Sequence, residues 1–237
     1  MKTINKTEGL CDKCLKRVPA RTFEQDGAVF IEKNCDEHGK FVALHAWDDP
    51  DIHKGLVKIS TLDSQPAQVV AALTYKCNLN CRVCYARANE VDVKDLKIED
   101  LDKINDYPIV FLSGGEPTFR PDLPAIISQL KSKGKKIVMF SNGLKLANRK
   151  YTRLLKEAGL RCVILQFDTV DDGECEYIRG KKIVNIKRKA IKNMQATGLP
   201  VYLYCTMIKN RSVERMKEIF DFAAGYSVIR AISVNPL

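Results

Sequence analysis

The sequence predicts an α/β protein in which a parallel sheet of six strands follows a small metal-binding β module. Two observations predict this class. Apolar runs rich in β-branched residues alternate with helical stretches from residue 68 onward, and two short ligand pairs lie close together before residue 40. Alternation of this kind builds a parallel sheet whose loops at the carboxyl ends of the strands carry chemistry. Six strands suit either an open doubly wound sheet or a partial barrel.

Residues 1–47 are predicted to form a separate module with four metal ligands. The ligands come as two pairs with two residues between the partners, separated by twenty residues: Cys11, Cys14, Cys35 and His38. Short strands at Arg17–Arg21 and Ala28–Glu32 flank a turn, so that a hairpin would connect the two pairs. Three thiolates and an imidazole suit a tetrahedral Zn²⁺, and a mononuclear iron of the rubredoxin kind is the alternative.

Residues 48–67 are predicted to be a linker that contains a short helix or strand. The segment is polar and is interrupted by Pro50, Gly55 and Pro66.

Residues 68–237 are predicted to form the core domain. The expected strands are Val69–Leu73, Ile109–Leu112, Lys136–Phe140, Val163–Phe167, Val201–Thr206 and Val228–Val234. The expected helices are Val83–Val91 with Ile98–Asn105, Pro121–Lys133, Lys145–Ala158, Ile183–Thr197 and Val213–Ala224. Gly134, Gly159 and Gly198 stand where three of these helices would end.

Three cysteines follow the first strand of this domain at offsets of four and three residues: Cys77, Cys81 and Cys84. Cysteines at this density are ligands of a metal or a cluster, and iron–sulfur clusters are held by thiolates. Three ligands leave one of the four irons of a [4Fe–4S] cluster open for a substrate or cofactor. We therefore expect a catalytic iron–sulfur site at this edge of the sheet.

Three further motifs end the next three strands and should therefore meet the cysteines at the same edge of the sheet. They are Gly114-Gly115-Glu116, Ser141-Asn142, and Gln166 with Asp168. Paired glycines allow a ligand to approach the backbone closely. Other interpretations stay open for two of the motifs. Ser141 and Asn142 could cap a helix, and Gln166 could be a satisfied polar group inside a barrel.

These motifs together resemble the radical S-adenosylmethionine (SAM) superfamily. The resemblance covers residues 68–237, with the departure that Val83 stands where an aromatic residue often precedes the last cysteine. It implies a partial (β/α)6 barrel in which the three cysteines bind a [4Fe–4S] cluster and SAM chelates the fourth iron. One-electron reduction would then yield a 5′-deoxyadenosyl radical that abstracts hydrogen.

The resemblance also implies roles for the other motifs. Gly114, Gly115 and Glu116 are similar to the motif that receives the methionine amino group. Ser141, Asn142, Gln166 and Asp168 would bind the ribose or carboxylate of SAM. The backbone of Ile232–Asn235 would flank the adenine.

The module and barrel together are similar to a group that includes tetraether lipid synthase and dihydropterin methyltransferases. This implies radical carbon–carbon coupling of lipid chains, with a pterin or peptide substrate as the alternative, and a reduced ferredoxin- or flavodoxin-type electron donor. Members of that group continue past the sixth strand into a domain with auxiliary clusters. We therefore expect this chain to be either a fragment or a short relative. A truncated, non-catalytic iron–sulfur or zinc protein that transfers electrons or binds a partner is the alternative of another class.

The composition adds weaker constraints. No apolar stretch is long enough to span a membrane, and the first ten residues lack a signal-peptide core. Together with nine cysteines, this predicts a cytoplasmic protein with reduced thiols. The net charge of +10 includes a basic cluster, which indicates a solvated helix face or contact with an anionic partner such as a membrane surface. The cluster consists of Arg179, Lys181, Lys182, Lys187, Arg188, Lys189 and Lys192. It contains no interleaved aromatic residues of the kind that bind nucleic acid.

Overall fold

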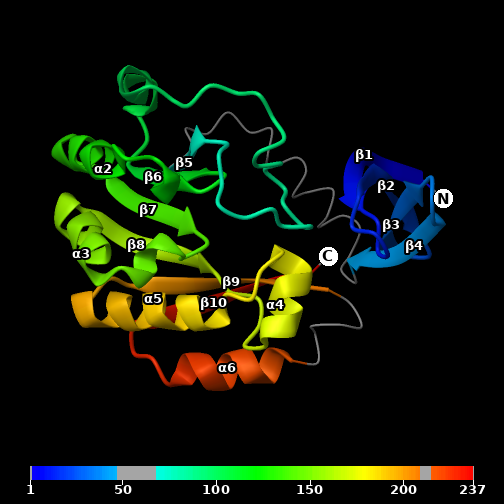
Figure 1. Ribbon diagram of the computed structural model, residues 1–237. Helices are drawn as coiled ribbons and strands as arrows, with labels where there is room; N and C mark the ends of the chain where they lie inside the picture. The colour runs from blue at the N-terminus through cyan, green and yellow to red at the C-terminus, as the bar shows by residue number, and fades with distance from the viewer. Residues whose placement is uncertain (1, 47–67, 209–214, 237) are drawn as a thin grey trace. The chain divides into compact units, whose positions relative to one another are not determined.

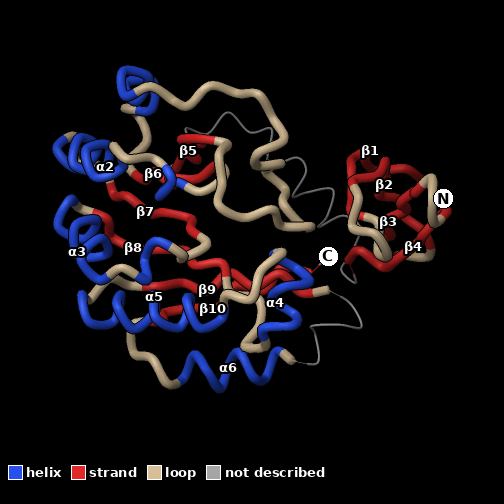
Figure 2. The backbone as a smooth tube through the Cα atoms, viewed as in Figure 1, coloured by secondary structure: helices blue, strands red, loops and turns tan. Residues whose placement is uncertain are grey.

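We describe the fold from a computed structural model, drawn as a ribbon in Figure 1 and as a tube in Figure 2. The described residues are 2–46, 68–208 and 215–236. The chain divides into two compact units, Met1–Gln65 and Pro66–Leu237. The predicted linker, residues 48–67, lies outside the described residues.

The first unit is a four-stranded antiparallel sheet in the order β1-β2-β3-β4. Its strands are β1 (Lys2–Leu10), β2 (Arg17–Gln25), β3 (Ala28–Cys35) and β4 (Gly39–Ala46). The predicted central hairpin is confirmed, but β1 and β4 were not predicted. Strand β1 is rich in polar and charged residues, and β4 contains a short run of four apolar residues, so neither has the clear hydrophobic alternation by which a strand is identified from sequence.

The second unit contains six parallel strands in the order β10-β9-β8-β7-β6-β5, which confirms the predicted α/β class. The strands are β5 (Gln68–Thr74), β6 (Ile109–Gly114), β7 (Lys136–Ser141), β8 (Leu160–Gln166), β9 (Val201–Met207) and β10 (Ile229–Pro236). Because β5 and β10 end the order without pairing to each other, the sheet is an open, partial barrel. The parallel pairing brings the carboxyl ends of β5 to β9 to one edge.

Helices connect the strands and cover the outer side of the sheet (Figure 1). The α-helices are α2 (Leu123–Ser132), α3 (Arg149–Ala158), α4 (Asp172–Arg179), α5 (Val184–Thr197) and α6 (Met216–Ala224). Short 3-10 helices are η1 (Ile98–Ile104), η2 (Pro117–Phe119) and η3 (Lys145–Ala147). A continuous apolar core between helices and sheet includes Leu112, Ile127, Met139 and Leu203, all fully buried.

Two predictions for the second unit are wrong. Residues 83–91 form turns instead of a helix, because their N–H groups bond elsewhere: Ala88 N–H donates to Cys84 Sγ and Asn89 N–H to the Tyr75 carbonyl. Conversely, helix α4 forms where no helix was predicted. Asp171 caps its N-terminus, since the Asp171 carboxylate accepts the Glu174 N–H at 2.8 Å.

The described helices include none that is both long enough and apolar enough to cross a membrane.

Candidate functional sites

The four ligands predicted in the first unit come together at one end of its sheet. Cys11 and Cys14 lie on the turn between β1 and β2, while Cys35 and His38 lie at the turn between β3 and β4. Their ligand atoms all lie within 4.8 Å of one another. Antiparallel pairing of four strands in sequence order places these two turns at the same end.

The separations among these ligand atoms fit a tetrahedral metal. Cys14 Sγ lies 3.9 Å from Cys35 Sγ. His38 Nδ1 lies 3.7 Å from Cys11 Sγ and 3.5 Å from Cys35 Sγ. Zinc bonds of about 2.3 Å to sulfur and about 2.0 Å to nitrogen place tetrahedral ligands about 3.5 to 3.8 Å apart. The residues present therefore fit a Cys3His metal site, with Nδ1 as the histidine ligand atom.

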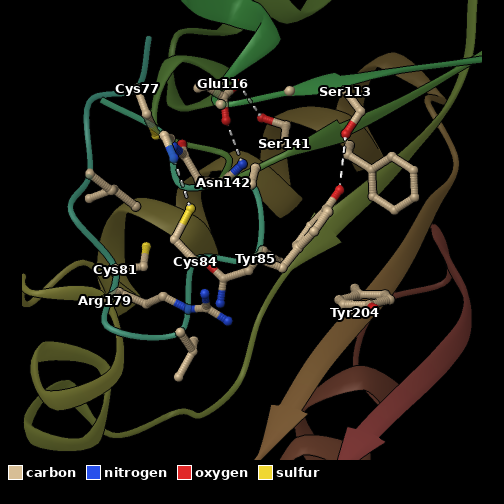
Figure 3. A pocket seen from close by; sticks show the side chains of 18 of the residues that line it. Cys77, Cys81, Cys84, Tyr85, Ser113, Glu116, Ser141, Asn142, Arg179 and Tyr204 are labelled. Atoms are coloured by element: carbon tan, nitrogen blue, oxygen red, sulfur yellow. Dashed lines mark hydrogen bonds between the residues drawn. The ribbon is translucent and has the colours of Figure 1, made fainter. Parts of the chain in front are cut away.

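In the second unit, a cavity of about 250 Å³ opens at the carboxyl edge of the sheet. Its lining includes all three cysteines of the predicted cluster site: Cys77, Cys81 and Cys84. It also includes Gly114, Gly115, Glu116, Ser141, Asn142 and Gln166. Figure 3 shows the cysteines together with Asn142, Glu116 and Arg179 around this space. The remaining wall is mostly apolar and aromatic: Leu79, Val83, Tyr85, Phe140, Ile164 and Tyr204.

Asn89 holds the loop that carries the three cysteines. Its Oδ1 accepts the Cys77 N–H at 2.8 Å, while its Nδ2 donates to the carbonyls of Cys77 and Leu79 and to Asn80 Oδ1. Its backbone has a φ of 67°, a left-handed conformation that asparagine tolerates better than most residues. One side chain thus satisfies polar groups of a loop that has no regular secondary structure.

The two glycines of the Gly114-Gly115-Glu116 motif are required by the close passage of the chain after β5. A Cβ at Gly114 would lie 2.1 Å from the Thr74 carbonyl oxygen, and one at Gly115 would lie 2.5 Å from the Lys76 carbonyl oxygen. The Gly115 N–H donates to the Thr74 carbonyl at 2.7 Å. The glycines therefore bring β6 against the segment that enters the cysteine loop, in addition to lining the cavity.

Glu116 is 1% exposed, and its carboxylate already accepts four hydrogen bonds from the protein. The donors are Thr118 N–H at 3.2 Å, Thr118 Oγ1 at 2.7 Å, Ser141 Oγ at 2.9 Å and Asn142 N–H at 2.7 Å. Burial raises the pKa of this carboxyl, and the four donors oppose that effect. The Glu116 side chain thereby fixes the turn after β7 that carries Ser141 and Asn142.

Asn142 connects this turn to the cysteine loop. Its Nδ2 donates to Asn78 Oδ1 at 2.7 Å and lies 3.9 Å from Cys77 Sγ. Its Oδ1 accepts the Leu144 N–H at 3.0 Å, within the turn that precedes η3. The N-cap residue of η3 is Leu144, with no side-chain cap hydrogen bond, so Asn142 does not act as the helix cap that the sequence left open. The turn orients the amide so that its donor group faces the cluster site.

Asp168 lies behind the cavity wall and is 2% exposed. Its two oxygens accept a bidentate pair of hydrogen bonds from Arg179, at 2.8 Å from Nε and 2.7 Å from Nη2. Burial opposes ionisation of Asp168, but Arg179, Lys187 and the Thr206 N–H together hold its pKa below the ordinary value. Among the described residues, Arg179 lines the cavity and Asp168 does not.

Lys187 occupies the layer beneath the same wall and is 2% exposed. Its Nζ donates to the Gln166 carbonyl at 2.8 Å and to Gln166 Oε1 at 2.5 Å. The Gln166 amide nitrogen donates in turn to Asp168. The structure thus corrects the expectation of a solvated basic face at two positions, since Arg179 and Lys187 are buried.

The thiols of the cysteine loop fit the predicted cluster. Burial raises the pKa of Cys77 to about 11 and raises that of Cys81, so neither thiol favours the thiolate without a bound cation. Donors are nevertheless directed at the sulfurs. Ala88 N–H lies 3.4 Å from Cys84 Sγ, and the positive charge of the Arg179 guanidinium interacts with Cys81. Such donors stabilise cluster-bound thiolates.

Sequence reasoning missed three residues of this site: Asn89, Arg179 and Lys187. None belongs to a recognisable motif, because each acts on groups far away in the sequence or on loop backbone.

The remaining cysteines outside the ligand sets, Cys162, Cys175 and Cys205, are all buried. Cys175 packs with Leu79, Ile183 and Val184 beneath the cysteine loop. Ile232–Asn235 lies in β10, outside the cavity lining among the described residues.

Comparisons with known proteins cover both units. Residues 3–46 match the HMPTM N-terminal zinc ribbon domain. A 7,8-dihydro-6-hydroxymethylpterin dimethyltransferase of Methanocaldococcus jannaschii is 33% identical over 98% of this chain and 53% of its own length. An Fe-coproporphyrin III synthase of Methanosarcina barkeri is 32% identical over 67% of this chain and 41% of its own length. The chain spans about half the length of the curated relatives it matches.

Among solved structures, Streptococcus suis SuiB bound to S-adenosylmethionine has the same fold, with a TM-score of 0.64 at 21% identity. That alignment covers 81% of this chain and 48% of SuiB. Residues 72–223 match the Radical SAM superfamily model, which begins within β5, ends within helix α6 and includes the three cysteines that line the cavity. A [4Fe–4S] cluster and SAM are the cofactors that this family uses, and the chain belongs to the radical SAM superfamily.

Proposed function

We propose that this chain is the cluster- and SAM-binding part of a radical SAM enzyme that methylates a dihydropterin. The observation that carries the proposal is the match to the pterin dimethyltransferase, which extends over 98% of this chain and both of its units. The Fe-coproporphyrin III synthase and a probable GTP 3′,8-cyclase of Methanococcus maripaludis match a smaller share of this chain, 67% and 70%. The zinc ribbon therefore supports the pterin proposal more specifically than the barrel does, because the pterin dimethyltransferase match includes both units.

In this proposal Cys77, Cys81 and Cys84 bind the cluster. Together with SAM, a [4Fe–4S] cluster supplies one-electron reduction of the sulfonium and abstraction of hydrogen from an unreactive C–H bond. The protein has to bind, orient and shield these groups. The cavity and the buried donors around it provide that environment.

The polar lining would orient SAM. The backbone of Gly114 and Gly115 would receive the methionine amino group, and Asn142, Ser141 and Gln166 would contact the carboxylate or ribose. Glu116 and Asp168 would act indirectly, because the carboxylate of each is already held by protein donors. Glu116 fixes the Ser141-Asn142 turn, and Asp168 fixes Arg179.

Radical coupling of lipid chains is the second candidate function. The observation that favours it is the apolar and aromatic wall of the cavity, which includes Val83, Phe140, Ile164 and Tyr204. Such a wall suits an alkyl chain as well as the flat ring of a pterin. Peripheral contact of the basic protein with a membrane surface would accompany that function. Either function needs a reduced electron donor of the ferredoxin or flavodoxin type.

The test begins with anaerobic reconstitution of the 237-residue protein, followed by SAM and dithionite. We expect 5′-deoxyadenosine to form in the unaltered protein and in Cys162→Ala, a buried cysteine outside the cavity lining, and to be lost in Cys81→Ala. A cluster that forms without any cleavage of SAM would leave only a non-catalytic iron–sulfur protein.

Substrate addition separates the two candidate functions. Dihydropterin should increase the yield of 5′-deoxyadenosine and give a product methylated by a second molecule of SAM or by another added one-carbon donor, detectable by mass spectrometry. A diether lipid in place of the pterin should give no coupled product. The reverse result would reject the pterin proposal in favour of lipid coupling.

A further inference from the structure

The buried layer beneath Cys81 contains two cationic side chains and one carboxylate. Asp168 accepts two hydrogen bonds from Arg179, and the Thr206 N–H donates to the same carboxylate at 2.9 Å. Arg179 is 6% exposed and Asp168 2% exposed, so water screens this pair only weakly. The Arg179 side chain lies beside Cys81 in Figure 3, and its charge interacts with both Asp168 and Cys81.

Lys187 acts on the same carboxylate from helix α5. Its charge interacts with Asp168 and Cys81, and its hydrogen bonds go to the neutral Gln166. Burial lowers the pKa of Lys187, and Asp168 opposes that effect. The other groups that face this layer, Thr206 and Cys175, carry no compensating charge while Cys175 remains a thiol, and burial raises the pKa of that thiol.

The charges are distributed unequally across the cysteine site. The cations that influence Cys81 are Arg179 and Lys187, whereas the charged group that influences Cys77 is the Glu116 carboxylate. Asp168 can neutralise one of the two cations but not both. A positive charge is therefore left over on the Cys81 side.

We propose that Arg179 and Lys187 are positioning residues that share the single carboxylate of Asp168 and thereby leave a net positive charge beside Cys81, where it raises the reduction potential of the cluster. Reduction adds one negative charge to the cluster, and a nearby cation in a weakly screened layer stabilises the added charge. The inference rests on the proposed cluster site at Cys77, Cys81 and Cys84.

The test is an EPR-monitored redox titration of the reconstituted 237-residue protein in the absence of SAM. Lys187→Met removes the surplus charge with little change in volume. At a fixed potential we expect the ratio of reduced to oxidised cluster to fall about tenfold, which corresponds to about 59 mV for a one-electron couple. Lys192→Met makes the same change at an exposed position of the same helix and should leave the ratio unchanged.

Changes of opposite sign distinguish electrostatics from packing. Asp168→Asn removes the negative charge without changing the shape of the side chain, so the ratio of reduced to oxidised cluster should rise. Arg179→Lys keeps the charge and should stay near the unaltered protein, whereas Arg179→Met should lower the ratio. Iron content and circular dichroism, measured on every variant, show which proteins carry an intact cluster. If Arg179→Met does not fold, Lys187→Met serves as the variant that removes a positive charge and Arg179→Lys as the variant that keeps it.

A fall of the ratio in Lys187→Met together with a rise in Asp168→Asn would support the inference. Equal ratios in Lys187→Met and Lys192→Met would overturn it while leaving the cluster site intact. Failure of the unaltered protein to bind any cluster would overturn the proposed function and this inference together.

Discussion

Asn89 and Cys77 bond to each other twice: the Cys77 N–H donates to Asn89 Oδ1 at 2.8 Å, and Asn89 Nδ2 donates to the Cys77 carbonyl at 3.1 Å. The two residues are twelve positions apart, and the loop between them contains all three cysteines of the proposed cluster site. The loop is thus closed by a side chain rather than by a helix or a strand pair. Its order before cofactor binding depends on this asparagine.

Replacement of Asn89 by glycine should therefore loosen the cysteine loop. Glycine keeps the left-handed backbone and removes only the side-chain hydrogen bonds, each of which contributes about 1 kcal/mol. We expect amide hydrogen exchange in residues 77–90 to become at least about tenfold faster and reconstituted iron per chain to fall. Exchange in helix α2 should not change, and equal acceleration there would indicate global destabilisation instead.

Replacement of Cys11 by serine should remove the metal from the first unit. Cys11 and Cys35 are buried at the ligand cluster, and the remaining core of this sheet is small, so metal binding should supply part of its folding free energy. We expect zinc, or iron if that is the native metal, to fall by about one atom per chain and amide hydrogen exchange in strands β2 and β3 to become faster.

Cys162→Ser, a change in the second unit, is the control for this experiment and should leave the zinc content intact. Unchanged metal content in Cys11→Ser would contradict the four-ligand site. Plasma mass spectrometry of both variants distinguishes zinc from iron.

Replacement of Gly115 by alanine should be far more disruptive than the same change at Gly134. A Cβ at Gly115 would lie 2.5 Å from the Lys76 carbonyl oxygen, whereas one at Gly134 has no atom within 4 Å despite a φ of 75°. We expect Gly134→Ala to cost about 1 kcal/mol and Gly115→Ala at least about 3 kcal/mol in urea unfolding. Similar costs for the two variants would show that the chain after β5 can move away.

Replacement of Asp168 by asparagine should lower the free energy of unfolding at neutral pH. It should also reduce the dependence of that free energy on pH in the acidic range. The pKa of Asp168 is held below its ordinary value of 3.8, so the stability that ionised Asp168 contributes is present above that value and lost as pH falls through the lower pKa of the folded state. Breaking a buried pair costs about 3 to 5 kcal/mol.

Urea unfolding at pH 7 and pH 3 measures this difference. The free energy of unfolding of Asp168→Asn should be lower than that of the unaltered protein at pH 7, and the gap should narrow at pH 3. Glu176→Gln, a change at an exposed carboxylate of the same region, should show no comparable gap. A gap of equal size at both pH values would mean that Asp168 stabilises the fold by shape rather than by charge.

Local features of the sequence were sufficient to predict the parallel sheet and the two sets of metal ligands. Strand β7 (Lys136–Ser141) is a short β-branched and apolar run, and such a run needs no knowledge of its neighbours to be identified. The pairs Cys11/Cys14 and Cys35/His38 likewise lie within single turns, so their spacing indicates the ligands. The structure adds that all four ligand atoms meet.

Residues that act across long stretches of chain could not be predicted in this way. Asn142 reaches Asn78 across 64 positions, and Glu116 reaches Ser141 across 25. The sequence placed Glu116 and Asp168 correctly at the strand ends. It could not show that protein donors already occupy their carboxylates, because those donors come from other strands and helices.

The sequence by itself determined the α/β class, the six parallel strands, the two cysteine sites and the superfamily, because periodicity and ligand spacing are properties of short segments. Only the tertiary structure decided that Arg179 and Lys187 are buried beneath Cys81 instead of lying on a solvated basic face. Whether a cation faces water or a carboxylate depends on which elements pack over it. That packing is what assembles Asp168, Arg179 and Lys187 into one charged layer behind the cysteine site.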